Sequence, residues 1–210
     1  VVGKRASDFR PTPEVLAAVE SADAIVIGPG SLYTNLIPAL LIEEINEAIR
    51  QSRARKIFVC NLMTQPNQTE GYSVADHVRA IHRHCGFRLD YVLAHRRGTI
   101  SPEVLERYRR SSAALVQPQV VGNDDSQVAV FPGTPQEMAL IEGAIFVERD
   151  LAAEVMEPDP VTGEERLVVR HDPSKLGRTL HTLLHDYALQ KRLSVSRAIF
   201  REYDIRGVVG

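Results

Sequence analysis

Short apolar runs alternate with longer stretches of helical periodicity along the first half of the chain. The short runs are rich in β-branched residues and predict buried strands at residues 24–27, 56–60 and 90–94. Apolar residues spaced three and four apart predict helices at residues 13–20, 37–51, 73–84 and 102–110. Strands that alternate with helices indicate right-handed parallel crossovers. The pattern therefore predicts an α/β fold with a Rossmann-like, doubly wound, mostly parallel sheet.

The second half of the chain is less regular. It predicts a strand at 113–116, turns at 122–125 and 132–133, a helix at 134–142, a strand at 144–147, a loop at 158–163, a strand at 166–170 and a helix from 172 to about 187. Neither internal repeats nor low-complexity segments occur in the sequence.

Composition and charge narrow the class of protein. The 210 residues are 44% hydrophobic and 25% charged, which is typical of a globular domain. Neither a membrane-spanning apolar run nor a signal-peptide core is present, so we expect a cytoplasmic protein without a membrane partner. A net charge of −2 argues against nucleic acid as a partner, and we expect the arginine-rich stretch 79–110 to be a solvated face. The first residue is Val1 rather than Met, which suggests an excerpt of a longer protein.

The loop after the first predicted strand carries candidate phosphate-binding chemistry. Gly28 and Gly30 allow positive φ and close backbone approach, so successive amides and the start of the next helix could cradle an anion. Ser31 and Thr34 add hydroxyl donors, and Tyr33 could stack on a ring. The dinucleotide fingerprint is only half met, however, and an ordinary strand-to-helix turn also explains the loop.

The loop after the second predicted strand offers neutral hydrogen-bonding groups. Asn61, Thr64 and Gln65 suit recognition of a sugar or a base edge. Asp76 beside His77 could transfer a proton, although a carboxylate near a helix N-terminus is an equally good explanation. Because carboxyl ends of parallel strands meet at one edge of a sheet, we expect both loops to form one ligand site.

Metal-binding patterns are weak. Histidines cluster at residues 77–85 and pair at His181 and His185, yet neither spacing matches a known metal motif, and we predict no metal site. Arg170 ends a predicted strand and could clamp a phosphate, but a structural ion pair with a neighbouring acid is as good an explanation.

Four stretches together resemble the CofD-like family. They are IGPGSLYTNLIPALL, VCNLMTQPNQTEGYSVADHVRAI, LDYVLAH and LVVRHDPSKL. This family contains the 2-phospho-L-lactate transferases and the YvcK-type gluconeogenesis factors, and the chain is more similar to the latter. The resemblance implies binding of a nucleoside diphosphate sugar such as UDP-N-acetylglucosamine, and roles in carbon metabolism and cell-wall or cell-shape control. It places Gly30, Ser31, Tyr33, Thr34, Asn61, Thr64 and Gln65 along the ligand cleft and makes Arg170 a nucleotide-sugar contact.

The chain departs from the family at both ends. The glycine-rich loop on the family's first strand does not occur, so residues 1–188 correspond to the C-terminal portion of the fold, incomplete at its N-terminal side. Residues 189–210 resemble the start of phosphohexomutases and are expected to be a tail or linker. Glu70 replaces a frequent Asp, and Pro173 follows the RHD motif where some members carry a phosphorylatable Thr.

Three functions remain open from the sequence. The first is a regulator that binds a UDP-sugar without turnover, which allows a homo-oligomer. The second is a Mg²⁺-dependent transferase acting on a nucleoside-diphosphate donor, for which Asp76 and Glu70 are the carboxylates nearest the cleft. The third is an NAD(P)-binding oxidoreductase, which rests on half a fingerprint.

Overall fold

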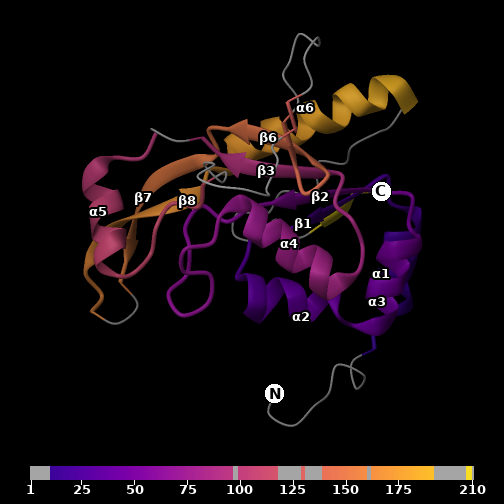
Figure 1. Cartoon of the computed structure of the whole chain (residues 1–210), viewed down its shortest axis with the longest axis horizontal. Helices are drawn as coiled ribbons and strands as arrows, with labels where there is room; N and C mark the ends of the chain where they lie inside the picture. The colour runs from indigo at the N-terminus through magenta and orange to yellow at the C-terminus, as the bar shows by residue number, and fades with distance from the viewer. Residues whose placement is uncertain are drawn as a thin grey trace.

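A seven-stranded sheet forms the centre of the computed structural model, which describes residues 10–96, 99–117, 129–130, 139–159, 162–191 and 207–209 (Figure 1). Four neighbouring strands are parallel: β1 (Ala24–Ile27), β2 (Arg55–Val59), β3 (Tyr91–His95) and β6 (Ala144–Arg149). Three antiparallel strands extend it at the edges: β4 (Ala129–Val130) and β5 (Ala139–Ile141) beyond β6, and β9 (Gly207–Val209) beside β1. The predicted α/β fold with a mostly parallel sheet is confirmed.

Helices cover both faces of this sheet. One face carries α1 (Pro13–Ser21), α3 (Glu43–Gln51) and α4 (Val74–Cys85), and the other carries α6 (Pro173–Lys191) (Figure 1). Side chains along β1 alternate between the two layers, as the pleat of a strand requires. Ile25 and Ile27 pack into the cluster around α4, whereas Ala24 and Val26 pack with the leucines of α6. Burial on both faces explains why the parallel strands are continuously apolar.

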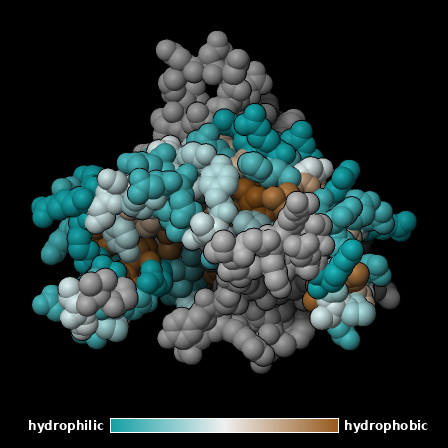
Figure 2. Space-filling model, turned by 90° about the horizontal axis from the view of Figure 1, so that it is seen from below, coloured by the Kyte–Doolittle hydropathy of each residue, from teal (hydrophilic) through white to brown (hydrophobic). Residues whose placement is uncertain are grey.

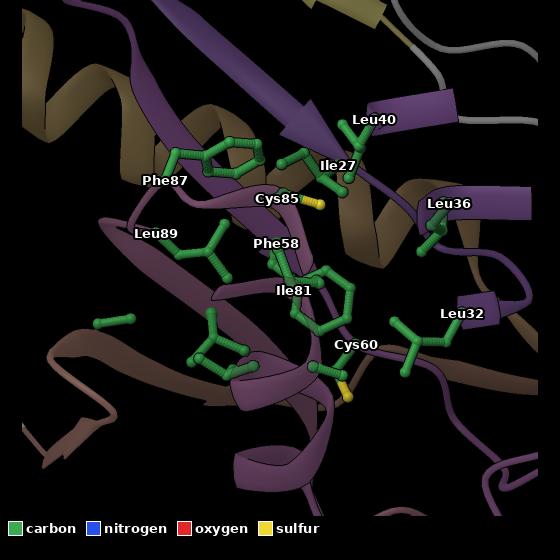
Figure 3. Close-up of a cluster of buried hydrophobic side chains, with 14 of the residues drawn as sticks. Ile27, Leu32, Leu36, Leu40, Phe58, Cys60, Ile81, Cys85, Phe87 and Leu89 are labelled. Carbon is green, nitrogen blue, oxygen red and sulfur yellow. The ribbon is translucent and has the colours of Figure 1, made fainter. Parts of the chain in front are cut away.

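The larger core cluster lies between the sheet and α4. Phe58 of β2 lies beside Ile81 of α4, and both side chains are fully buried (Figure 3). Cys60 and Cys85 belong to the same cluster as free thiols. Burial raises the pKa of the Cys85 thiol to about 11 and also raises that of Cys60, so neither is a nucleophile at neutral pH.

A separate two-stranded hairpin stands at one end of the sheet. Its strands are β7 (Ala152–Pro158) and β8 (Glu165–His171), and α5 (Pro102–Arg110) packs beside it (Figure 1). A third apolar cluster joins these parts, with Leu62 from the loop after β2, Val104 from α5 and Val169 from β8. This packing brings the hairpin to the loop that follows β2.

The prediction of one helix at 37–51 is wrong. A π-helical turn (Leu32–Leu36) leads into a four-residue helix, α2 (Ile37–Leu40), and α3 begins only at Glu43. Ile42 between them is extended, with φ −61° and ψ 119°. The Asn46 amide stabilises the break, because its Nδ2 donates to the carbonyls of Leu40 (3.0 Å) and Cys85 (2.8 Å).

Other differences lie in the second half. Residues 139–141, expected at the end of a helix, form β5, because the positive-φ turn at Glu142 and Gly143 folds them back onto β6. The expected strand at 113–116 contributes only a bridge between Leu115 and Met63, and β7 was not predicted. The turns expected at 122–125 and 132–133 lie outside the described residues.

Few of the large apolar side chains that the structure describes reach the surface. On the face seen in Figure 2, hydrophilic residues form most of the coloured surface and hydrophobic ones show mainly in recesses between them. Among the described residues, the exposed large hydrophobics are Val15, Leu41 and Met156. Within the same part of the chain, no helix combines the length and apolarity needed to cross a membrane.

Candidate functional site

A cleft of about 540 Å³ opens at the carboxyl ends of β1 and β2, between the sheet and the β7–β8 hairpin. Four segments line it: the loop after β1, the loop after β2, the end of α5 with the residues that follow, and β8. The lining residues are Pro29, Gly30, Ser31, Asn61, Leu62, Met63, Thr64, Gln65, Pro66, Arg107, Tyr108, Ser111, Ala113, Arg166, Val168, Val169, Arg170 and His171. The two loops that the sequence assigned to one ligand site therefore do meet.

Hydrogen bonds hold the two strand-end loops together. The Gly30 N–H donates to Asn61 Oδ1 (3.2 Å), so this amide already has a partner and is not a free anion donor. Gln65 Nε2 donates to Ser31 Oγ (2.8 Å), which leaves the Ser31 hydroxyl hydrogen available to donate into the cleft. Thr64 is buried, and its Oγ1 accepts the Ala114 N–H at 2.8 Å. Thr64 and Asn61 thus shape the cleft, while Ser31 offers it a donor.

The opposite wall of the cleft carries positive charge. Arg107 comes from α5, and Arg166 and Arg170 come from β8; neither Asp nor Glu lines the cleft among the described residues. Tyr108 Oη accepts the Val169 N–H at 3.1 Å, so its own hydroxyl hydrogen is free to donate. A wall of guanidinium and hydroxyl donors suits an anion with several oxygens, such as a diphosphate.

Acidic residues on β7 and the following loop pair with two of these arginines. Arg170 makes a bidentate pair with Glu157, with Nε–Oε1 at 2.9 Å and Nη2–Oε2 at 2.5 Å. Arg166 Nη1 lies 2.7 Å from Asp159 Oδ2. The structural ion pair expected for Arg170 is present, with Glu157 as its partner, and Arg170 also lines the cleft, where phosphate binding stays a prediction.

Two imidazoles remain neutral at the cleft: His171, which lines it, and the nearby His95. Burial, with His95 nearby, lowers the pKa of His171 to about 4. Burial also lowers the pKa of His95, whose Nδ1 accepts the Leu151 N–H (3.1 Å); its Nε2 must therefore carry the hydrogen that it donates to Thr99 Oγ1 (2.9 Å). The positive charge of the cleft lining thus comes from its arginines rather than from these imidazoles.

Several predicted site residues lie elsewhere. Gly28 lies beneath the cleft, packed against β2, and Thr34 is exposed in the π-helical turn. Tyr33 and Asp76 line a different pocket, beside α4. Asp76 forms a capping box with Ser73 and an ion pair with Arg79, while Glu70 is exposed on the loop. Hence neither of the carboxylates proposed for Mg²⁺ lines the cleft.

The histidines that cluster in the sequence make contacts within the protein. His77 is fully buried, with its Nδ1 2.8 Å from the Ser73 carbonyl, and His82 accepts the Leu89 N–H through Nε2. His181 and His185 stack on α6. Across the residues that the structure describes, no group of three or more His, Cys, Asp and Glu side chains is placed to hold a metal ion.

Sequence reasoning missed Arg107, Tyr108 and Arg166. All three reach the cleft through the packing of α5 and the hairpin beside the loop after β2. Helical spacing offered one signal, since Arg107 and Ser111 stand four residues apart and so lie on one side of the chain as α5 ends. The arginine-rich stretch is therefore not simply a solvated face.

Comparisons with known proteins identify the family. The family model described as "2-phospho-L-lactate transferase CofD" matches residues 2–133. A relative from Thermotoga maritima is 39% identical over 171 residues, which are 81% of this chain and 47% of that protein. The gluconeogenesis factors of Halalkalibacterium halodurans and Bacillus subtilis are 48% and 43% identical over 110 and 108 residues, or 52% and 50% of this chain. These matches cover 34% and 33% of the two relatives, so the chain spans between a third and a half of such proteins.

A solved structure supports the same assignment. The crystal structure of a UPF0052 family protein from Bacillus halodurans superposes with a TM-score of 0.62 at 33% identity and covers 83% of this chain and 47% of that one. The sequence match and the structural superposition therefore both extend over most of this chain. The chain belongs to the CofD family and, within it, is similar to the gluconeogenesis factors.

Proposed function

We propose that the cleft binds a nucleoside diphosphate sugar of the UDP-N-acetylglucosamine type and that the protein acts as a cytoplasmic regulator of carbon metabolism. The supporting observation is the division of the cleft into two walls. Arg107, Arg166 and Arg170 form a cationic wall for the diphosphate. Neutral donors and acceptors on the strand-end loops, including Ser31 and Gln65, face the base or the sugar.

The names of the Bacillus subtilis and Halalkalibacterium halodurans relatives support the metabolic part of the proposal. A sensor of a UDP-amino sugar would report on cell-wall synthesis, which consumes such sugars, and so would connect it to carbon supply. This connection is the basis on which we extend the proposal to cell-wall and cell-shape control.

A transferase is the second candidate, because the matching family model is described as a phospholactate transferase. Such an enzyme would use carboxylates to hold Mg²⁺. The cleft residues do not fit that ion, since no Asp or Glu lines the described cleft and the nearby carboxylates Glu157 and Asp159 are held in ion pairs with Arg170 and Arg166. The described lining therefore favours contact between arginine and phosphate over a metal bridge.

Binding of UDP-N-acetylglucosamine to the full-length protein tests the proposal. Arg170→Ala removes a charge-assisted contact and should weaken binding roughly 10- to 100-fold by calorimetry. Glu157→Gln removes the competing negative charge beside Arg170 and should tighten binding about threefold. Arg110→Ala, three residues from Arg107 on the exposed face of α5, is the matched control and should change nothing.

The outcome separates the two candidates. UDP-sugar binding that is indifferent to Mg²⁺ and follows these variants supports the regulator. Binding of GDP that requires Mg²⁺ would instead support the transferase. Unchanged affinity in both Arg170→Ala and Glu157→Gln would refute the assignment of the cleft.

A further inference from the structure

A second pocket of about 520 Å³ lies along the outer face of α4. Tyr33 of the π-helical turn and Tyr72, just before α4, line it together with residues of α4 and with Arg88. Among the residues that the structure describes, it shares no lining residue with the cleft. The pocket is therefore a distinct site, and its chemistry can be considered without reference to the proposed function.

The two tyrosines provide a hydrogen-bond donor. Their hydroxyl oxygens are 2.9 Å apart, so one hydrogen lies between them and the hydrogen of the accepting tyrosine remains free. Burial and the hydrogen bond from Tyr72 raise the pKa of Tyr33 to about 12, which keeps this phenol protonated at neutral pH. The rings meet edge to face, with centroids 6.2 Å apart, and the His84 ring packs edge-on against Tyr33 at 6.0 Å. The pocket therefore combines a tyrosine hydroxyl donor with a wall of aromatic rings.

The charged residues of the pocket leave a positive excess. Arg79 pairs with Asp76 (3.2 Å) and with Glu142 (2.8 Å), so these groups balance one another. Arg83 and Arg88 are exposed at the same pocket, and neither pairs with a carboxylate among the described residues. Burial and Arg88 lower the pKa of His82 to about 4, so this ring stays neutral. The excess charge therefore rests on Arg83 and Arg88.

We propose that this pocket is a second ligand site, which takes a small phosphate monoester that carries a ring. Arg83 and the free tyrosine hydroxyl would bind the phosphate oxygens, and the tyrosine and His84 rings would contact the ring of the ligand. Arg88 adds long-range attraction at the rim.

Phenyl phosphate is the probe that tests this site in the full-length protein, with inorganic phosphate and phenol as its two halves. Calorimetry or NMR titration should show saturable binding of phenyl phosphate that is tighter than that of either half. Arg83→Gln should weaken it roughly tenfold, as should the double change Tyr33→Phe with Tyr72→Phe, which removes both hydroxyls and keeps both rings. Arg50→Gln on the exposed part of α3 is the control and should have no effect.

Arg170→Ala distinguishes this pocket from the cleft. Phenyl phosphate binding should survive that change, whether or not the cleft binds a nucleotide sugar. Loss of binding in Arg170→Ala with full binding in Arg83→Gln would place the anion in the cleft and overturn the proposal. Absence of saturable binding up to about 10 mM, or equal affinity for inorganic phosphate, would also overturn it.

Discussion

At the scale of single residues, the Asp76 carboxylate stabilises the start of α4. Its Oδ2 accepts the Ser73 N–H (2.8 Å) and the Ser73 hydroxyl (2.6 Å), and Ser73 Oγ accepts the Asp76 N–H in return. The sequence left Asp76 open between proton transfer and a helix N-terminus. The reciprocal bonds favour the second role, and the three-residue spacing from Ser73 is typical of a capping box.

Replacement of Asp76 by alanine should lower the free energy of unfolding by about 1 kcal/mol at neutral pH. Burial raises the pKa of Asp76, but the hydrogen bonds from Ser73 and the Arg79 charge outweigh it and lower the pKa below its usual range. A lowered folded-state pKa stabilises the protein above the unfolded value of about 4, and this contribution is lost as pH falls through the folded-state pKa. Urea unfolding at several pH values measures it.

Glu103→Ala is the control for this experiment. Glu103 is an acid in the first turn of α5, where the N-cap residue Ser101 makes no side-chain cap bond, so its loss should cost less than about 0.5 kcal/mol. If the deficit of Asp76→Ala stayed constant well below about pH 4, packing rather than the carboxylate charge would be its source.

At the scale of elements, the sequence predicts what local pattern determines. The buried strands β1, β2 and β3 and the helices α1, α4 and α5 follow from apolar runs and helical spacing within one segment. The break at Ile42 depends on Asn46 bonding to Cys85, 39 residues away, and β5 depends on pairing with β6. Such long-range interactions do not show in the spacing of apolar residues. The sequence therefore wrongly predicted one helix at 37–51 and a helix rather than a strand at 139–141.

The candidate site likewise has one part that local sequence pattern predicts and one part that depends on long-range packing. Gly30, Ser31, Asn61, Thr64 and Gln65 could be predicted because they follow strands whose carboxyl ends must meet. The opposite wall depends on how the β7–β8 hairpin packs against α5, a tertiary arrangement that no short motif specifies. On that wall the sequence predicted only Arg170, from its place at the end of a strand and from the family resemblance.

Gly28 and Gly86 form a matched pair that tests how closely β1 approaches β2. Both have positive φ, 84° and 70°. A Cβ on Gly28 would lie 2.8 Å from the Val59 carbonyl oxygen, whereas one on Gly86 would meet nothing within 4 Å. Gly28→Ala should therefore cost about 3 kcal/mol of stability and Gly86→Ala about 1 kcal/mol, measured by urea unfolding. Equal costs would mean that backbone strain alone governs both positions.

At the scale of the whole molecule, α6 completes the fold by covering the second face of the sheet. Leu176, Leu180 and Leu184 are buried against side chains of β1 and β2, including Val26 and Ile57. The chain reaches α6 directly from β8, the strand that brings Arg170 to the cleft. Core packing and the cationic wall therefore depend on the same segment.

Leu180→Ala should remove about 3 kcal/mol from the free energy of unfolding, because its side chain is 1% exposed and a cavity would remain. Met156→Ala, at a side chain that is 58% exposed on β7, should change stability by less than about 0.5 kcal/mol. Chemical unfolding of both variants measures the difference. Similar small effects would show that α6 does not pack on the sheet in solution.

The π-helical turn Leu32–Leu36 has a further consequence for the molecule as a whole. Ser31, at its start, faces the cleft, while Tyr33, two residues later, faces the second pocket. Leu32 and Leu36 anchor the turn in the core, so its residues cannot shift independently (Figure 3). If a ligand in one pocket shifts this turn, thermodynamic linkage requires that occupancy of either pocket change affinity at the other by the same factor. Under that condition, a ligand beside α4 would tune the affinity of the cleft for its own ligand.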